Sequence, residues 1–345
     1  MTLRRWAVTA AAVLAVAFAS HAVLAQKQPA PSPLASPIDL TVEPWMFSPL
    51  GAIASDRLTL SGAIRIASDD PRFGGFSGLV VSADGQKLLA VSDDGWWLKG
   101  TLQYKDGRLS GFSSAMMAPL KGADGKRATS KRMRDAEAMV ALSPKGPDGP
   151  VAVGFERLPR VEVFNPGRDG FPDRPRAVKM PRDVEAGPEN DELEAIGLLK
   201  SGRYIAISEG NMRDDSSVYG WVFGGADRPF DFGVKLDGSY RVTDLAVLPS
   251  GDVLLLERSF AAPTWIPGMA IRLVKADAIK AKATLDPETL FEGEVPRYLV
   301  DNMEGLAVWQ TPEGETRLLV MSDDNFARDR QSTLLVEFVL KPASN

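Results

Sequence analysis

The sequence has 345 residues, of which 44% are hydrophobic and 25% are charged, and its formal net charge is −5. This composition indicates a globular protein with a large core, and its acidic balance argues against general binding of nucleic acid. There is no cysteine, and the single histidine, His21, lies near the N-terminus. The rest of the chain therefore lacks the residues for disulfides, Ser-His-Asp or Cys-His triads, and thiolate or imidazole zinc sites. Any metal would be held by oxygen, which favours calcium, followed by magnesium or manganese.

The first part of the chain has the features of a secretory signal peptide. Arg4 and Arg5 precede an apolar stretch, and small residues form a cleavage motif that ends at Ala25, although cleavage after Ala22 also fits. We therefore expect residues 1–25 to direct export to the periplasm or out of the cell, through the Sec pathway or, given the paired arginines, the twin-arginine pathway. The apolar stretch is too short for stable membrane insertion.

Residues 26–44, QKQPAPSPLASPIDLTVEP, are rich in proline and polar residues. This composition is typical of a flexible linker. The domain that follows is expected to span residues 45–345.

Beyond residue 60, short β-rich segments alternate with glycine-containing turns, and no long helical period is present. Five units align with one another, and each consists of an apolar strand, a turn and a second apolar strand that ends in an acid. The aligned residues at the heads of the units are Ser77, Glu137, Glu194, Asp244 and Glu304. They are 60, 57, 50 and 60 residues apart, and repeats of this size made of antiparallel strands indicate a β-propeller.

The predicted fold is thus all-β, a single β-propeller with five visible repeats and five or six blades. The last strand-like segment, residues 333–340, lacks a hairpin partner of its own. Residues 57–67, RLTLSGAIRIA, can pair with it and close the ring between N- and C-terminal strands, which would remove exposed sheet edges.

The acids of the repeats should gather at one mouth of the propeller, because the first strand of a hairpin starts where the second one ends. The acids expected to close the second strands are Asp93, Glu156, Glu209, Glu257 and Asp323. So many carboxylates near one axis must be neutralised, protonated or strongly hydrogen-bonded. Two interpretations remain: a cation bound in the channel, or a structural latch in which each acid accepts hydrogen bonds from a neighbouring blade.

A cation bound at the mouth would be coordinated by these acids, since calcium prefers carboxylate and carbonyl oxygens. The candidate metal ligands, directly or through water, are Glu137, Glu194, Asp244 and Glu304, followed by Asn302 and Asp93.

Basic residues are the candidates for binding an anionic substrate. The run KRATSKRMRD places Lys131, Arg132 and Arg134 directly before Glu137, so this loop should lie over the acidic mouth. Arg258 follows an acid and either binds substrate or forms an interblade salt bridge. Basic groups beside a metal would hold phosphate. The alternative is that the loop is simply exposed and solvated.

Several segments resemble one known family. FSGL, VSDDG, DAEAM, ELEAI, TDLAVLPSGDVLLLER, NMEGLAV and MSDDNF are similar to the phytase-like domain family, also described as having esterase-like activity of phytase, from about Gly74 to Leu340. The resemblance implies an exported bacterial β-propeller that hydrolyses phosphoesters or esters, with calcium as its metal. The sequence departs from the family pattern at Ala138 and Ala195, where the family tends to have glycine after the acid. It also departs at Ser77, which leaves the first repeat without its acid.

Two functions are consistent with these observations. The first is a calcium-dependent phosphoesterase, in which metal and basic groups bind a small anionic or ester substrate. One of Glu137, Glu194 or Glu304 would orient or deprotonate the attacking water. The second is a non-catalytic periplasmic propeller that binds a ligand or a partner protein, with purely structural acids. In the first, Glu304→Gln should abolish activity, and in the second it should lower stability.

Overall fold

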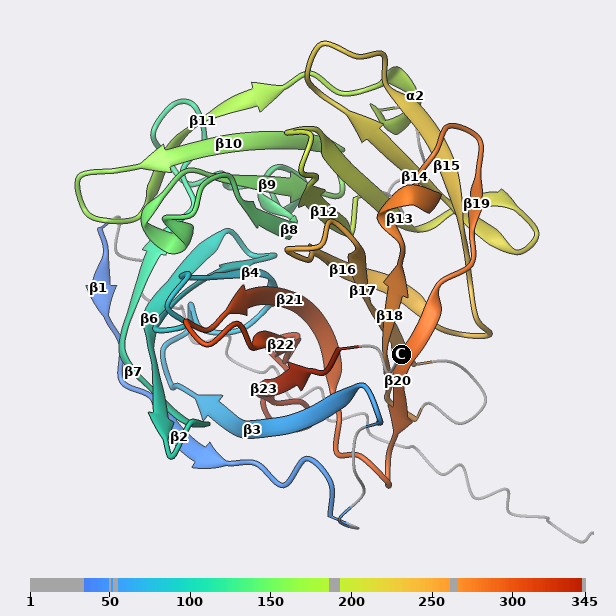
Figure 1. Ribbon diagram of the computed structural model, residues 1–345. Coiled ribbons are helices and arrows are strands. Elements are labelled where there is room, and N and C mark those ends of the chain that lie inside the picture. The colour runs from blue at the N-terminus through green and yellow to red at the C-terminus, as the bar shows by residue number, and fades with distance from the viewer. Residues whose placement is uncertain (1–33, 50, 52–54, 186–192, 261–265, 343–345) are drawn as a thin grey trace, which may run out of the picture. The chain divides into compact units, whose positions relative to one another are not determined.

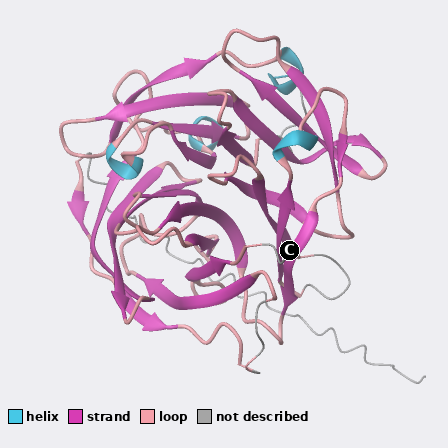
Figure 2. Ribbon diagram, in the orientation of Figure 1, coloured by secondary structure: helices cyan, strands magenta, loops and turns pink. Residues whose placement is uncertain are grey.

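The computed structural model describes residues 34–49, 51, 55–185, 193–260 and 266–342. The predicted signal peptide and residues 26–33 of the predicted linker lie outside these ranges. Within the described part of the chain, no helix has the length and apolar character needed to cross a membrane. Figure 2 shows that strands make up nearly all of the regular structure. The helical segments are α1 (Lys131–Arg134), α2 (Arg182–Glu185) and the 3-10 turns Gly146–Asp148 and Ala276–Ala278.

The described strands form five sheets, which are the five blades of a β-propeller (Figure 1). Blade 1 contains, from the channel outwards, β4 (Phe76–Val81), β5 (Lys87–Ser92), β6 (Trp96–Lys105), β7 (Arg108–Pro119) and β1 (Ser36–Pro37). Blade 2 contains β8 (Ala136–Ala141), β9 (Val151–Phe155), β10 (Arg160–Pro166) and β11 (Pro172–Val178). Blade 3 contains β12 (Ala195–Leu198), β13 (Tyr204–Asp214), β14 (Ser217–Phe223), β15 (Phe230–Lys235) and β19 (Thr284–Leu285).

Blade 4 contains β16 (Arg241–Val247), β17 (Val253–Ser259), β18 (Gly268–Val274) and β20 (Glu288–Glu294). Blade 5 contains β21 (Asn302–Gln310), β22 (Thr316–Asp323), β23 (Thr333–Leu340), β3 (Leu58–Ala67) and β2 (Thr41–Pro44). The predicted all-β propeller is confirmed, and the described chain has five blades.

The innermost strand of each blade lies beside the innermost strands of both neighbouring blades, in chain order around the ring. Because another blade packs on each side, these strands are largely buried on both faces, and β4 is buried at every position. Each innermost strand forms a hairpin with the next strand, as the repeats predicted. The turns of these hairpins carry glycines with positive φ, a conformation that other residues rarely adopt: Gly85, Gly146, Gly202, Gly251 and Gly314.

The apolar core is distributed around the ring. Among the described residues, buried apolar side chains form five clusters, one between each pair of adjacent blades. The cluster between blades 5 and 1, for example, joins Ile64 and Leu335 to Leu79 and Trp96. The central axis is therefore left to the residues at the ends of the inner strands.

Blade 5 combines strands from the two ends of the chain. β3 pairs antiparallel with β23, from Leu58 opposite Leu340 to Ile66 opposite Thr333. The predicted closure of the ring between these two segments is therefore confirmed.

A buried polar network reinforces this closure. Glu337 on β23 is fully buried and accepts hydrogen bonds from the Tyr104 hydroxyl at 2.8 Å and the Arg317 guanidinium at 2.7 Å. Tyr104 belongs to blade 1, so the network joins the closing blade to the first one.

Two strands lie inside the segment predicted to be a flexible linker. β1 pairs with β7 at the outer edge of blade 1, and β2 pairs with β3 at the outer edge of blade 5. Ile38, Leu40 and Val42 pack, partly buried, against the cluster between these two blades. The predicted linker of residues 26–44 is corrected for this stretch, because three spaced apolar residues are enough to fix an otherwise polar segment onto the sheets.

Candidate functional site

A β-bulge lies near the start of the inner strand in four blades. In β4, β8, β16 and β21 the register shifts and leaves one extra residue. These residues are Ser77, Glu137, Thr243 and Glu304. A bulge bends the strand and redirects a side chain, here at the mouth of the channel. In blade 3 the corresponding residue, Glu194, directly precedes β12.

Asp244 does not belong to this ring, contrary to the prediction from the repeats. The bulge residue of blade 4 is Thr243, and Asp244 follows it. The buried carboxylate of Asp244 accepts the backbone N–H of Leu245 at 2.8 Å and that of Leu306, in blade 5, at 2.6 Å. Burial raises the pKa of Asp244 well above its usual value, although these hydrogen bonds oppose the shift. Asp244 thus joins blades 4 and 5 through backbone hydrogen bonds, as the latch interpretation of the acids expected.

The ends of the second strands supply a second ring at the same mouth. It consists of Asp93, Glu156, Glu209, Arg258 and Asp323. In blade 1, Ser92 lies opposite Phe76, and the next residue, Asp93, belongs to the ring. In blade 4, Glu257 lies opposite Val242 in the same way, so the next residue, Arg258, belongs to the ring. Glu257, predicted to face the channel, is instead buried in blade 4, with its Oε2 2.6 Å from Arg272 Nε.

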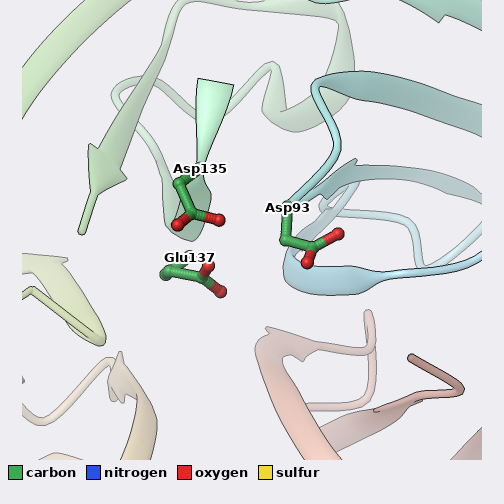
Figure 3. Close-up of side chains that lie close together, drawn as sticks. All are labelled: Asp93, Asp135 and Glu137. Atoms are coloured by element: carbon green, nitrogen blue, oxygen red, sulfur yellow. The ribbon is translucent and has the colours of Figure 1, made fainter. Parts of the chain in front are cut away.

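Three carboxylates from two blades converge at this mouth (Figure 3). Asp93 follows β5, and Asp135 and Glu137 lie at the start of β8. One oxygen of each lies within 4.8 Å of the other two. Asp93 Oδ1 is buried and finds no hydrogen-bond partner in the described part of the chain. Carboxylate oxygens gathered in this way suit a hard cation such as calcium.

Cations from the protein already neutralise part of this cluster. Lys131 Nζ contacts a carboxylate oxygen of Asp135 and lies 2.5 Å from Asp93 Oδ2, while Arg157 Nε lies 2.6 Å from Asp135 Oδ2. Burial lowers the pKa of Lys131, but the two carboxylates hold it above its usual value. Burial raises the pKa of Asp93, and Lys131 opposes this shift. A bound cation would therefore compete with the Lys131 ammonium.

Three glutamates of blades 2 and 3, Glu137, Glu156 and Glu194, have raised pKa values. Glu156 and Glu194 are hydrogen-bonded to each other, and burial followed by the charge of Asp135 raises the pKa of Glu156 to about 7. Burial followed by the charge of Glu209 raises the pKa of Glu194 well above its usual value. Burial followed by the charge of Glu194 does the same for Glu137. A cation bound here would favour release of their protons.

Arg258 joins three blades. Its guanidinium lies 2.9 Å from Glu209 Oε1 in blade 3 and 3.0 Å from Glu304 Oε1 in blade 5, so it forms the interblade salt bridge that was one of its two predicted roles. Burial raises the pKa of Glu304 to about 7, and Arg258 and a hydrogen bond from Asn302 oppose the shift. Glu304 can therefore gain or lose a proton near neutral pH.

The basic loop lies over the mouth as the sequence predicted, and its side chains have different partners. Arg134 and Arg127 both pair with the Asp94 carboxylate at 2.6 Å. Arg132 is exposed, and its Nε donates to the carbonyl oxygen of Arg157 at 3.4 Å. The loop is thus held against blades 1 and 2 by ion pairs and hydrogen bonds.

The channel continues beyond the acids. A cavity of about 210 Å³ there is lined by the inner strands of all five blades, including the apolar side chains of Leu79, Met139, Leu198, Leu245 and Leu306.

A larger, open pocket of about 740 Å³ adjoins the acids between blades 4 and 5. Glu304 and Arg258 form the edge that it shares with the acidic mouth. Its other walls come from the residues after β17, before β18, at the start of β21 and between β22 and β23.

Of the predicted ligands, Asp93 and Glu137 lie in the three-carboxylate cluster, Glu194 and Glu304 interact with it through their charges, and Asn302 contacts Glu304. The prediction missed Asp135. The signal was present in DAEAM, because residues two apart on a strand share a face. The units were aligned on Glu137 and its equivalents, and Asp135 lies two residues before that position.

Comparison with known proteins identifies one family for most of the chain. The family model described as "Phytase-like: Esterase-like activity of phytase" matches residues 71–326. No curated protein matches the chain.

Among solved structures, the chain is similar to an endo-arabinase from Bacteroides thetaiotaomicron VPI-5482. The identity is 11%, the TM-score is 0.45, and the match covers 80% of this chain and 96% of that one. It is also similar to two structures of glucose dehydrogenase, with 11% and 10% identity and TM-scores of 0.39 and 0.41, each covering 83% of this chain and 99% of the other. Likeness this distant does not bear on activity.

Proposed function

Because the chain belongs to the phytase-like family, we propose that it is an exported, calcium-dependent phosphoester hydrolase whose active site is the acidic mouth of the propeller. The observation that carries the proposal is the cluster of Asp93, Asp135 and Glu137, whose carboxylate oxygens converge within 4.8 Å. The signal-peptide features of residues 1–25 support export.

The donor set fits calcium better than a softer metal. All three side chains offer oxygen, and the buried Asp93 Oδ1 has no hydrogen bond from the described residues. Asp93, Asp135 and Glu137 would hold the ion, which would supply Lewis-acid polarisation of the ester and positive charge to stabilise the transition state.

The surrounding residues provide proton transfer and charge. Glu304, whose pKa is raised to about 7, would accept a proton from the attacking water. The hydrogen-bonded pair of Glu156 and Glu194 holds a proton that can pass to the leaving oxygen. Arg258, held by ion pairs with Glu304 and Glu209, lies at the same side of the mouth. Its positive charge would neutralise part of the negative charge of the phosphate.

The experiment that tests this assignment is hydrolysis of para-nitrophenyl phosphate by the mature protein with calcium. Glu304→Gln and Glu137→Gln are expected to lower kcat by about 100-fold or more, because each removes a carboxylate from the reacting end. The matched control is Glu313→Gln, an exposed change on the hairpin turn of β21 and β22 at the opposite end. Normal hydrolysis by Glu304→Gln would show that this mechanism is wrong.

Calcium binding has a separate readout in thermal stability. After treatment with a chelator, added calcium is expected to raise the Tm of the wild type, because a ligand that binds only the native state stabilises it. In Glu137→Gln this increase should be lost or greatly reduced. If added calcium does not change the Tm of the wild type, the proposed metal site is wrong.

One observation favours a second candidate function. The Lys131 ammonium already contacts both Asp93 and Asp135, so part of the cluster is neutralised without a metal. In this alternative the propeller is a non-catalytic binding protein and the acids are structural. Absence of both a calcium-dependent Tm and hydrolysis would favour this function.

A further inference from the structure

The open pocket between blades 4 and 5 begins at the acids and leads away from them. Its inner edge is formed by Glu304 and Arg258, and its volume is about 740 Å³. Pockets that bind small molecules have volumes of this order. A substrate whose reacting group lies at the acids would therefore place the rest of the molecule here.

Part of the lining of this pocket is apolar. Phe260, which follows β17, lines the pocket and is 52% exposed. Val300 and Pro267 also line it. An exposed aromatic ring inside a pocket with polar edges is typical of a surface that stacks on a flat ligand.

Half of the polar side chains that line the pocket are neutral, and two of these are hydrogen-bonded to each other. The Asn325 side-chain amide donates to Gln331 Oε1 at 3.3 Å, and the Gln331 amide donates to Asp301 Oδ1 at 3.4 Å. Such groups can hydrogen-bond an uncharged polar substituent, but they do not neutralise an anion.

Positive charge is too scarce in this region for a polyanionic ligand. The pocket is lined by two arginines and two acids, Asp301 and Glu304. Arg258 is tied to Glu209 and Glu304, whereas Arg330 is exposed and lies 3.7 Å from Asp329. On the other side of the mouth, the cations are engaged by acids in the same way, as Lys131, Arg134, Arg127 and Arg157 show. Each additional phosphate on a substrate would meet carboxylates rather than unpaired cations, which disfavours its binding.

We propose that this pocket selects a monoester with a single phosphate and an uncharged, aromatic organic group, which packs against Phe260, and that it discriminates against polyphosphorylated substrates. This inference rests on the proposed phosphoester hydrolysis. In the reaction, the oxygen of water bonds to phosphorus and its proton passes to Glu304, while the bond from phosphorus to the ester oxygen breaks. The organic group leaves as the alcohol with a proton from the Glu156–Glu194 pair, and the proton gained by Glu304 is exchanged back to the pair through solvent.

The test compares phenyl phosphate, methyl phosphate and inositol hexakisphosphate as substrates of the calcium-loaded protein. The wild type should have the highest kcat/KM with phenyl phosphate. Phe260→Ala should lower that value by about threefold to tenfold, as expected for loss of an aromatic contact, and should leave methyl phosphate hydrolysis unchanged. The matched control is Met212→Ala on β13, which removes another exposed apolar side chain, 44% exposed, outside the pocket.

Binding supplies a readout that does not depend on turnover. By calorimetry in calcium, phenylphosphonate should bind more tightly than methylphosphonate, and Phe260→Ala should abolish the difference. Ala327→Arg, which adds a cation to the pocket wall, should increase affinity for inositol hexakisphosphate.

The outcomes separate this inference from the function on which it rests. If the wild type hydrolyses none of the three esters, the proposed function fails. If it hydrolyses methyl phosphate or inositol hexakisphosphate as well as phenyl phosphate, or if Phe260→Ala changes nothing, the hydrolase remains and the pocket inference is overturned.

Discussion

Buried and half-buried carboxylates occur in two regions of this propeller, and they are neutralised differently. Inside the blades, Glu257 pairs with Arg272 and Glu337 pairs with Arg317, while Asp244 accepts two backbone hydrogen bonds. At the mouth, the acids outnumber the cations that contact them. The acids are Asp93, Asp135, Glu137, Glu156, Glu194, Glu209, Glu304 and Asp323, and their partners among the described residues are Lys131, Arg157 and Arg258.

The difference separates structural acids from functional ones. A buried acid with its own arginine contributes to the fold without needing a ligand. An excess of buried acids raises the free energy of the native state unless protons or a cation compensate, and perturbed acids of this kind mark functional sites. Changes in the two regions should therefore affect stability in opposite directions.

The largest effect is expected inside blade 4. Arg272 is 3% exposed and pairs with Glu257 at 2.6 Å and Glu292 at 3.0 Å. Arg272→Met should lower the free energy of unfolding by about 3–5 kcal/mol, because it leaves a buried carboxylate unpaired. Urea denaturation would measure the loss. Lys235→Met, which breaks an exposed pair with Asp286, is the control and should cost less than about 1 kcal/mol. Equal losses in the two variants would contradict the comparison.

A smaller loss is expected at the latch between blades 4 and 5. Asp244→Asn keeps the size of the side chain but replaces one acceptor oxygen with an NH₂ group that faces a backbone N–H. The cost should be about 1–3 kcal/mol, the range for leaving a buried polar group unsatisfied. Calcium affinity, measured by titration, should remain that of the wild type. A large loss of calcium affinity with unchanged stability would restore Asp244 as a ligand.

Raising the pH should destabilise the metal-free protein. The pKa values of Glu156 and Glu304 are raised from 4.5 to about 7. Between these values the native state binds more protons than the unfolded state, so this stabilisation is complete below pH 4.5 and is lost as the pH rises through 7. Each unit of pKa displacement corresponds to about 1.4 kcal/mol. With chelator present, the Tm should be higher at pH 5.5 than at pH 8, and calcium should narrow the gap. A Tm that increases with pH would refute this account.

The smallest effect should be a gain in stability. Glu156→Gln removes one negative charge from the mouth and keeps a hydrogen-bonding partner for Glu194. We expect the metal-free protein at pH 8 to gain about 1 kcal/mol, with a flatter dependence of Tm on pH. Glu162→Gln in the same blade is the matched control, because Glu162 pairs with Arg160 at 3.1 Å and should not stabilise when neutralised. Loss of stability in Glu156→Gln would show that this acid is compensated after all.

The sequence was sufficient to predict the repeating hairpins, since glycine turns and apolar strands recur at each unit. It was not sufficient to fix register. In blade 4, Thr243 and Arg258 occupy the ring positions, and the predicted Asp244 and Glu257 lie one residue away. A bulge inserts one residue without altering the apolar pattern, so this displacement is invisible in the sequence.

Other features depended on contacts between distant segments. The edge strands β1 and β2 form because Ile38, Leu40 and Val42 meet an apolar cluster of two blades, which their polar neighbours in sequence do not reveal. The pocket at the mouth brings together residues that follow β17 and β22, far apart in the chain. Its location follows from the closed ring and not from any local motif.

The pairing of β3 with β23 has a consequence for synthesis of the protein. β3 is made early, and its partner is the last strand of the described chain. Until β23 has been synthesised, the edge of β3 that pairs with it is open, and the cluster between blades 5 and 1 lacks Leu335. Pairings this distant slow folding, and open edges invite aggregation. A chain that stops before Thr333 would lack β23, so the ring could not close. A circular permutant, with the original termini joined and new termini in a hairpin turn, would keep every strand pair.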